Sequence, residues 1–136
     1  MIEDIEPGKV WDALVADPKA QVCDVRTDAE WNFVGIPDLH SLGREPVLIP
    51  WQVYPTMQRN GGFLDHLREA GLTPETPIYF LCRSGARSLA AAQAAAAAGF
   101  TQVYNIADGF EGPLDPEGHR GKVGGWKAQG LPWQQR

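Results

Sequence analysis

The stretch Ile78-Tyr79-Phe80-Leu81-Cys82-Arg83-Ser84-Gly85-Ala86-Arg87-Ser88 joins an apolar run to a short polar loop, and an alanine-rich segment ending at Gly99 follows it. This order predicts a buried strand, a tight loop that carries a thiol, and then a helix. A helix N-terminus presents unpaired backbone N–H groups and a partial positive charge. It therefore attracts anions and favours the thiolate form of a neighbouring cysteine. Because two arginines add further positive charge, the loop suits both a sulfur nucleophile and an anionic substrate.

Short apolar runs alternate with amphipathic segments along the rest of the chain. The expected strands cover residues 20–25, 47–49, 78–81 and 102–106. The expected helices cover residues 9–16, one or two turns within 28–34, 63–70 and about 86–98. Apolar strands without strict alternation are typical of a parallel sheet that is covered on both faces. The predicted fold is therefore α/β, with a mostly parallel central sheet and helices on both faces.

Length and composition indicate one globular domain. The chain has 136 residues, of which 43% are hydrophobic and 21% charged, and we expect a single domain over 1–136 with its core over about 5–133. A net charge of −5 without a basic cluster argues against a nucleic-acid partner. No window approaches the roughly 18 apolar residues of a membrane span, and the first residues lack the features of a signal peptide. We therefore expect a cytoplasmic protein with no membrane partner.

The two cysteines, Cys23 and Cys82, differ in their predicted surroundings. Two cysteines do not make a disulfide framework, and a reduced, cytosolic state is the default expectation. Cys23 lies within an expected strand and is predicted to be an inert core residue. Cys82 stands in a polar loop, whose residues would line a core poorly. Neither the cysteines nor the three histidines show metal-ligand spacing, so we expect no metal and no cofactor.

The segment from Cys82 to Ser88 resembles the active-site loop of single-domain rhodaneses, the thiosulfate:cyanide sulfurtransferase family. Three further motifs are similar to the family's, in the same order, and the resemblance covers about 20–133: Val22-Cys23-Asp24-Val25-Arg26, Glu30-Trp31 with Gly35-Ile36-Pro37, and Tyr104-Asn105-Ile106 with Gly109-Phe110, Gly125-Trp126 and Gly130-Leu131-Pro132. Two departures are visible. The family's usual histidine between Gly35 and Ile36 is missing, and the C-terminal motif is split by residues 113–123.

The resemblance implies a rhodanese-like domain and a persulfide mechanism. Cys82 as thiolate would attack the outer sulfur of a thiosulfate-like donor, and a thiol or cyanide acceptor, including a protein thiol, would remove that sulfur. Asp24 and Arg26 resemble the family's structural pair near the site. Gly85 would supply the positive φ that a loop wrapped around one atom needs. The implied substrate-binding cradle consists of Arg83, Ser84, Gly85, Ala86, Arg87 and Ser88.

Two other functions remain open at this point. Phosphatases and arsenate reductases of the same fold need Cys-x5-Arg, so that a guanidinium can grip phosphate oxygens. Here the sixth position after Cys82 is Ser88, and Arg87 falls one residue early. A persulfide carrier or interaction module without turnover of its own needs the same loop as an enzyme. The turn-rich segment over 109–123 is either a surface excursion or a flap that brings His119 and Arg120 to the site.

Overall fold

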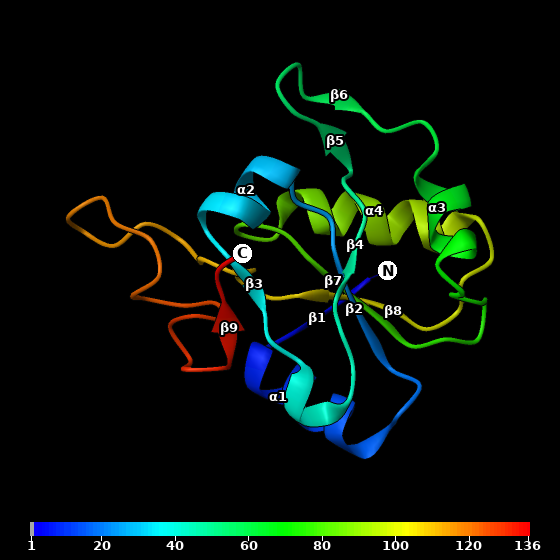
Figure 1. The fold of residues 1–136 in the computed structure, drawn as a ribbon, viewed down its shortest axis with the longest axis horizontal. Coiled ribbons are helices and arrows are strands. Elements are labelled where there is room, and N and C mark those ends of the chain that lie inside the picture. The colour runs from blue at the N-terminus through cyan, green and yellow to red at the C-terminus, as the bar shows by residue number, and fades with distance from the viewer. Residues whose placement is uncertain (1) are drawn as a thin grey trace.

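The computed structural model describes residues 2–136, which form a five-stranded parallel sheet with helices on both faces (Figure 1). The strand order is β1-β8-β7-β2-β4, and every neighbouring pair is parallel. The bounds are β1 Glu3–Ile5, β2 Gln21–Asp24, β4 Val47–Leu48, β7 Ile78–Leu81 and β8 Val103–Ile106. The predicted α/β class and parallel sheet are confirmed.

Each face of the sheet has its own hydrophobic core, because successive side chains of a strand point to opposite faces. Ile78 and Phe80 of β7 pack into the cluster beneath α3, Phe63–Glu69, and α4, Ala86–Ala97. Tyr79 and Leu81 pack into the cluster beneath α1, Pro7–Ala16. The continuous apolar run is thus explained by burial on both sides.

The alanine-rich helix α4 lies close against the sheet. Three of its alanines, Ala91, Ala92 and Ala95, are completely buried in the first core. Alanine has the highest helix propensity and the small side chain that permits close helix-to-sheet packing. This packing fixes the direction of the α4 N-terminus, where the polar loop ends.

The remaining elements are short and lie around the edges of the sheet. They are α2 Asp28–Phe33, β3 Ile36–Pro37, the 3-10 turn His40–Leu42, β5 Gln52–Val53, β6 Gln58–Arg59 and β9 Trp133–Gln134. β3 pairs antiparallel with β9, and β5 pairs antiparallel with β6. Near the C-terminal end, Trp126 is fully buried in the second core, whereas Trp133 remains 40% exposed.

Strand β1 and the short β3–β9 and β5–β6 pairings were not expected from the sequence. β1 has three residues, of which Glu3 and Asp4 are exposed, so it carries no apolar run. It is a strand because it pairs with β8 through the register Glu3↔Tyr104, Asp4↔Asn105 and Ile5↔Ile106. Over residues 2–136, the helices are all too short or too polar to cross a membrane.

Candidate active site

The cysteine loop lies where two parallel strands end side by side. Cys82 directly follows β7, and Asp24 is the last residue of the neighbouring strand β2, with Asp24 in register with Leu81. Ligand sites of open parallel sheets lie at this carboxyl-terminal edge. The loop and the predicted structural pair are therefore brought together, as the sequence motifs implied.

The thiol of Cys82 is buried but hydrogen-bonded by the loop around it. The residue is 2% exposed, and the Gly85 N–H donates to its Sγ at 3.1 Å. The Ser88 hydroxyl lies 3.1 Å from the same Sγ. Gly85 has φ 117° and is the N-cap of α4, so the positive φ expected there is confirmed. The sulfur thus lies at the first turn of a helix and accepts a backbone N–H.

The outer part of the loop is open to solvent. Arg83, Ser84 and Ala86 are exposed, and within residues 2–136 Arg83 forms no ion pair. Arg83 is therefore a free positive charge next to the cysteine, available to an anionic molecule.

Arg87 is not free in the same way. Its two terminal nitrogens donate to the two carboxylate oxygens of Glu30 at 2.7 and 2.8 Å. Hydrogen bonding to Glu30 raises the pKa of Arg87 against the opposing effect of burial. Burial by itself raises the pKa of Glu30, but Arg87 and the Thr27 backbone together hold it below its ordinary value. The Arg87 guanidinium is therefore held to Glu30 of α2, and its place in the substrate-binding cradle stays a prediction.

Glu30 also fixes the start of α2. The Thr27 side chain accepts from the Glu30 N–H, and the Glu30 carboxylate accepts from the Thr27 N–H, which is a capping box. One carboxylate thus joins the N-terminus of α2 to the cysteine loop. The spacing of Thr27 and Glu30 was visible in the sequence, but the partner 57 residues away was not.

The predicted structural pair, Asp24 and Arg26, connects three segments in the interior of the protein. Asp24 and Arg26 are both fully buried and form an ion pair at 2.7 Å. Arg26 also donates to the Gly35 carbonyl at 2.7 Å and lies 4.3 Å above the Phe110 ring. The pair thereby ties the end of β2 to the turn before β3 and to the segment after β8.

The segment after β8 holds the backbone of the cysteine loop in place. The Phe110 N–H donates to the Cys82 carbonyl at 2.8 Å, and the Glu111 N–H donates to the Arg83 carbonyl at 3.0 Å. Gly109 makes this approach feasible: it has φ 64°, and a Cβ there would overlap the Cys82 carbonyl and would lie 2.7 Å from the Arg83 backbone. Glycine is required at this position by both conformation and space.

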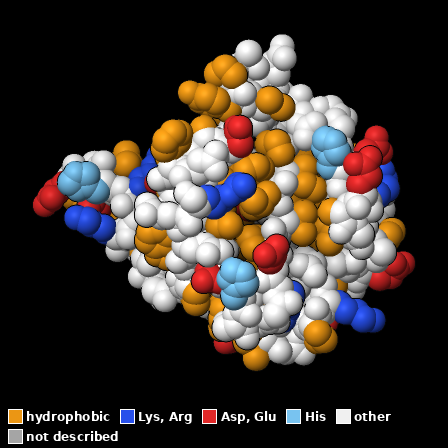
Figure 2. Space-filling view, viewed as in Figure 1, with side chains coloured by type: hydrophobic (Ala, Val, Ile, Leu, Met, Phe, Trp, Pro, Cys, Tyr) orange, Lys and Arg blue, Asp and Glu red, His pale blue; other side chains and the backbone are white. Residues whose placement is uncertain are grey.

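Beyond this base, the loop over 113–122 projects away from the domain (Figure 1). Its tip folds on itself, with the Asp115 N–H donating to the His119 carbonyl at 2.7 Å, and it carries charged side chains at the edge of the molecule (Figure 2). Arg120 donates to the Gly112 carbonyl. Among the described residues, neither His119 nor Arg120 forms a hydrogen bond with the cysteine loop. The tip is thus a surface excursion, and only its base supports the site.

Sequence reasoning missed the role of two residues beside the site, Asn105 and Asp4. The Ser88 hydroxyl lies 2.5 Å from Asn105 Oδ1, and Asn105 Nδ2 lies 2.9 Å from Asp4 Oδ1. Both flank a hollow of about 260 Å³ that also borders Gly85. Asn105 was part of a quoted motif, but its side-chain partners depend on the pairing of β1 with β8.

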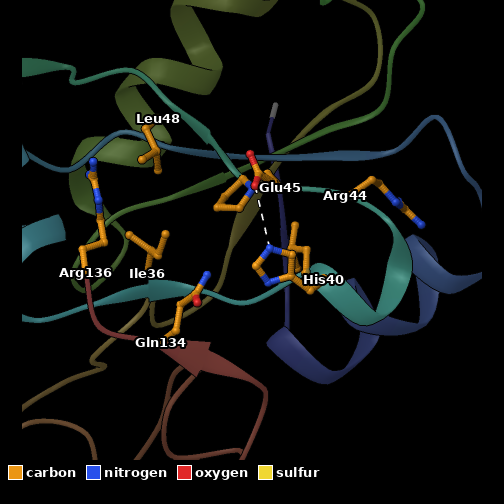
Figure 3. Close-up of a pocket in the computed structure, with 9 residues that line it drawn as sticks. Ile36, His40, Arg44, Glu45, Leu48, Gln134 and Arg136 are labelled. Carbon is orange, nitrogen blue, oxygen red and sulfur yellow. Dashed lines mark ion pairs between the residues drawn. The ribbon is translucent and has the colours of Figure 1, made fainter.

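A second hollow, of about 200 Å³, is lined by residues of β3, β4, β9 and the segment between β3 and β4 (Figure 3). No residue of the cysteine loop lines it. Its lining includes the apolar side chains of Ile36 and Leu48 and also His40, whose Nε2 lies 3.8 Å from Glu45 Oε1. The candidate active site is therefore the loop over 82–88 and its supports.

Comparison with known proteins places the chain among rhodanese-like domains. The family model of the STR4 middle domain matches residues 6–136. An uncharacterized protein of Rickettsia prowazekii is 36% identical over 135 residues, which cover 98% of each chain. A chloroplastic rhodanese-like domain-containing protein of Arabidopsis thaliana is 32% identical over 121 residues, which are 88% of this chain and 23% of that protein.

Solved structures agree on the fold. The crystal structure of an M. tuberculosis protein has a TM-score of 0.90 and 51% identity, with 98% of both chains covered. The polysulfide-sulfur transferase homodimer of Wolinella succinogenes has a TM-score of 0.65 and 23% identity, with 99% of this chain and 80% of that one covered. The expected rhodanese-like fold is confirmed, but the family model that matches is the STR4 middle domain and not that of the single-domain rhodaneses.

Proposed function

The chain belongs to the STR4 middle-domain family, and we propose that it is a sulfurtransferase that carries sulfur as a persulfide on Cys82. The observation that carries the proposal is the position of the Cys82 sulfur. It lies at the N-terminus of α4 and accepts the Gly85 N–H at 3.1 Å. A backbone donor directed at a sulfur atom stabilises negative charge on it. The Wolinella protein of similar fold, a polysulfide-sulfur transferase, supports the same class of chemistry.

The proposed reaction has two steps. In the first, the Cys82 thiolate attacks the outer sulfur of a thiosulfate-like donor, an S–S bond forms, and sulfite leaves with the electrons of the broken S–S bond. In the second, cyanide or a thiolate attacks the terminal sulfur of the persulfide. The acceptor leaves as thiocyanate or as a persulfide, and the Cys82 thiolate is regenerated. A separate general base is unnecessary because the nucleophile reacts as an anion.

The free guanidinium of Arg83 gives the donor its charge preference. It is exposed beside the cysteine and has no carboxylate partner within residues 2–136. An anionic sulfur donor can therefore pair with it while its outer sulfur approaches the thiolate. A protein thiol is the alternative acceptor, and an exposed loop edge at Ser84 and Ala86 leaves space for its approach.

Phosphoryl chemistry fits this loop less well. A cysteine phosphatase needs an arginine whose fork grips two phosphate oxygens. Here both terminal nitrogens of Arg87 donate hydrogen bonds to Glu30, and Ser88 occupies the sixth position after Cys82. Binding a phosphoryl group through Arg87 would break that ion pair.

The test is mass spectrometry of the purified protein after treatment with thiosulfate. We expect a gain of one sulfur, about 32 Da, on the peptide that contains Cys82, and its loss on addition of cyanide or dithiothreitol. Steady production of thiocyanate would then distinguish an enzyme from a carrier that is loaded once. Turnover of p-nitrophenyl phosphate without any sulfur adduct would overturn the proposal in favour of a phosphatase.

A further inference from the structure

The side-chain amide of Asn105 is held in one orientation. Its nitrogen donates to Asp4 Oδ1 at 2.9 Å and to the Gly85 carbonyl at 3.1 Å. Both partners are acceptors, so a flipped amide would place its oxygen against two oxygens. Asn105 Oδ1 is consequently fixed towards the Ser88 hydroxyl, 2.5 Å away.

This orientation decides where the single hydroxyl proton of Ser88 goes. Asn105 Oδ1 has no proton, so the short contact requires Ser88 to donate to it. The Ser88 oxygen then presents only lone pairs to Cys82 Sγ at 3.1 Å. A hydrogen bond between them can form only if the cysteine is a thiol and donates its S–H.

A thiolate reverses this arrangement. The sulfur anion needs donors, and Ser88 can supply one only by turning its proton away from Asn105. That turn leaves Asn105 Oδ1 without its donor in a side chain that is 4% exposed, which costs free energy. The Gly85 N–H favours the anion at the same sulfur, so the two neighbours of Cys82 act in opposite directions.

We propose that Asn105, anchored by Asp4, is a positioning residue that directs the Ser88 hydroxyl away from Cys82 and so holds the resting cysteine as a hydrogen-bonded thiol. The idea rests on the proposed function only in taking Cys82 as the reacting group. When the thiol proton passes to solvent and the anion forms, the same hydroxyl turns towards the sulfur, and the anion then attacks the donor. Asn105 thereby limits reaction of the empty site with unrelated electrophiles.

Other charged residues lie on the cysteine loop and on the elements around it, and they must be held constant in a test. Arg83 and Arg87 lie on its own loop, and the remaining charged neighbours come from β1, the end of β2, α2 and the segment after β8: Asp4, Asp24, Arg26, Glu30 and Asp108. Only Asp4 is altered in the variants below. Its carboxylate acts both as a charge and as a hydrogen-bond acceptor, so those two effects need separate variants.

The experiment follows alkylation of Cys82 by iodoacetamide against pH, read by mass spectrometry of its peptide in the full chain. In Asn105→Leu, we expect the midpoint to fall by about one pH unit, equivalent to about tenfold more thiolate at a fixed lower pH. In a Ser88→Ala background, the same Asn105→Leu change should produce no shift, because its effect passes through the hydroxyl.

A pair of variants at Asp4 tests the anchor without disturbing the interior. Asp4→Ala and Asp4→Asn both remove the charge, but asparagine still offers an oxygen to the Asn105 amide. We expect a midpoint in Asp4→Ala about half a pH unit below that of Asp4→Asn. If Asn105→Leu fails to fold, the two Asp4 variants test the positioning role of Asn105 by themselves.

Equal midpoints in the two Asp4 variants, or an Asn105→Leu shift that persists without Ser88, would overturn the proposal. Alkylation needs no sulfur donor. A protein that fails to form a persulfide but shows the expected midpoints would therefore refute the sulfurtransferase function and leave the positioning role standing.

Discussion

Cys23 lies on β2, Cys82 directly follows the neighbouring strand β7, and the two are almost equally inaccessible. Cys23 is 0% exposed and Cys82 2% exposed, and both belong to the core beneath α3 and α4. β2 and β7 pair in parallel, with Cys23 in register with Phe80, two residues before Cys82. Burial therefore does not separate the two thiols.

The two thiols differ in their hydrogen-bond partners. The Cys82 sulfur accepts from the Gly85 N–H and lies beside the Ser88 hydroxyl, whereas Cys23 is surrounded by apolar side chains within its core. Burial, and secondarily the charge of Asp24, raises the pKa of Cys23 well above its ordinary value. The comparison teaches that a strand end opening onto a helix N-terminus, and not exposure, gives a cysteine its chemistry here.

Replacing each cysteine in turn gives the largest expected difference in activity. Cys82→Ser should abolish the persulfide adduct and lower any thiosulfate:cyanide activity by at least about a thousandfold, because serine forms no anion at neutral pH. Cys23→Ala should keep activity within about twofold, as measured by thiocyanate production. Similar losses from both changes would mean that the two cysteines act together.

A methyl group at Gly109 tests how far the Cys82 loop depends on the segment after β8. Gly109→Ala forces a Cβ into the Cys82 and Arg83 backbone, so we expect a loss of about 3 kcal/mol in the free energy of unfolding and a large loss of activity. Gly118→Ala is the matched control: its φ is also positive, at 82°, but a Cβ there meets open space. It should lose only about 1 kcal/mol. Urea unfolding of both variants checks the difference, and equal losses would contradict the contact.

Removing the charge of Glu30 tests the link from α2 to the Cys82 loop. Glu30→Gln should lower the free energy of unfolding at pH 7 by about 1 kcal/mol, because a partly exposed charged pair is replaced by a neutral one. The pKa of Glu30 is lowered in the folded state, so its contribution is present above the ordinary value of about 4.3 and is lost as the pH falls through the lower folded value. Urea unfolding at pH 7 and pH 3 should show a gap that closes in acid. A gap of the same size at both pH values would argue against the ion pair.

The smallest effect concerns Cys23 in alkali. Because the folded pKa of Cys23 is raised, its stabilisation is complete below the ordinary thiol value of about 8.5 and declines as the pH rises above it. With Cys82→Ser in both proteins, the Cys23→Ala variant should lose less stability between pH 8 and pH 9 than its parent, by about 0.7 kcal/mol. Parallel pH profiles in urea unfolding would show that Cys23 does not titrate on unfolding.

The sequence predicted what depends on local patterns. The four expected strands and the alanine-rich helix are present, with ends that differ by a residue or two, because apolar runs and breakers act locally. The placement of Cys82 at the start of α4 followed from the order of strand, loop and helix, and that of Asp24 and Arg26 nearby followed from the family resemblance. The positive φ of Gly85 followed from the shape of the loop.

What the sequence could not predict depends on which distant residues meet. Strand β1 has no apolar run and exists through its pairing with β8, so Asp4 could not be placed beside Asn105. The partner of Arg87 could not be identified, because many other carboxylates in the sequence were as plausible as Glu30. In both cases the residue types were visible, and the three-dimensional arrangement of distant elements decided their contacts.

The outward loop over 113–122 also offers a place to attach something to this protein. Hydrogen bonds between 115 and 119 close its tip without help from the domain, so inserting a peptide tag or a dye-bearing residue there changes only the entropy of a surface loop, by about 0.6 kcal/mol for each doubling of its length. The base of the same loop donates to the carbonyls of Cys82 and Arg83. A fluorophore at the tip would therefore be connected through the base of the loop to the backbone of Cys82 and Arg83. We expect its signal to report on movement of the cysteine loop while the fluorophore itself stays outside the site.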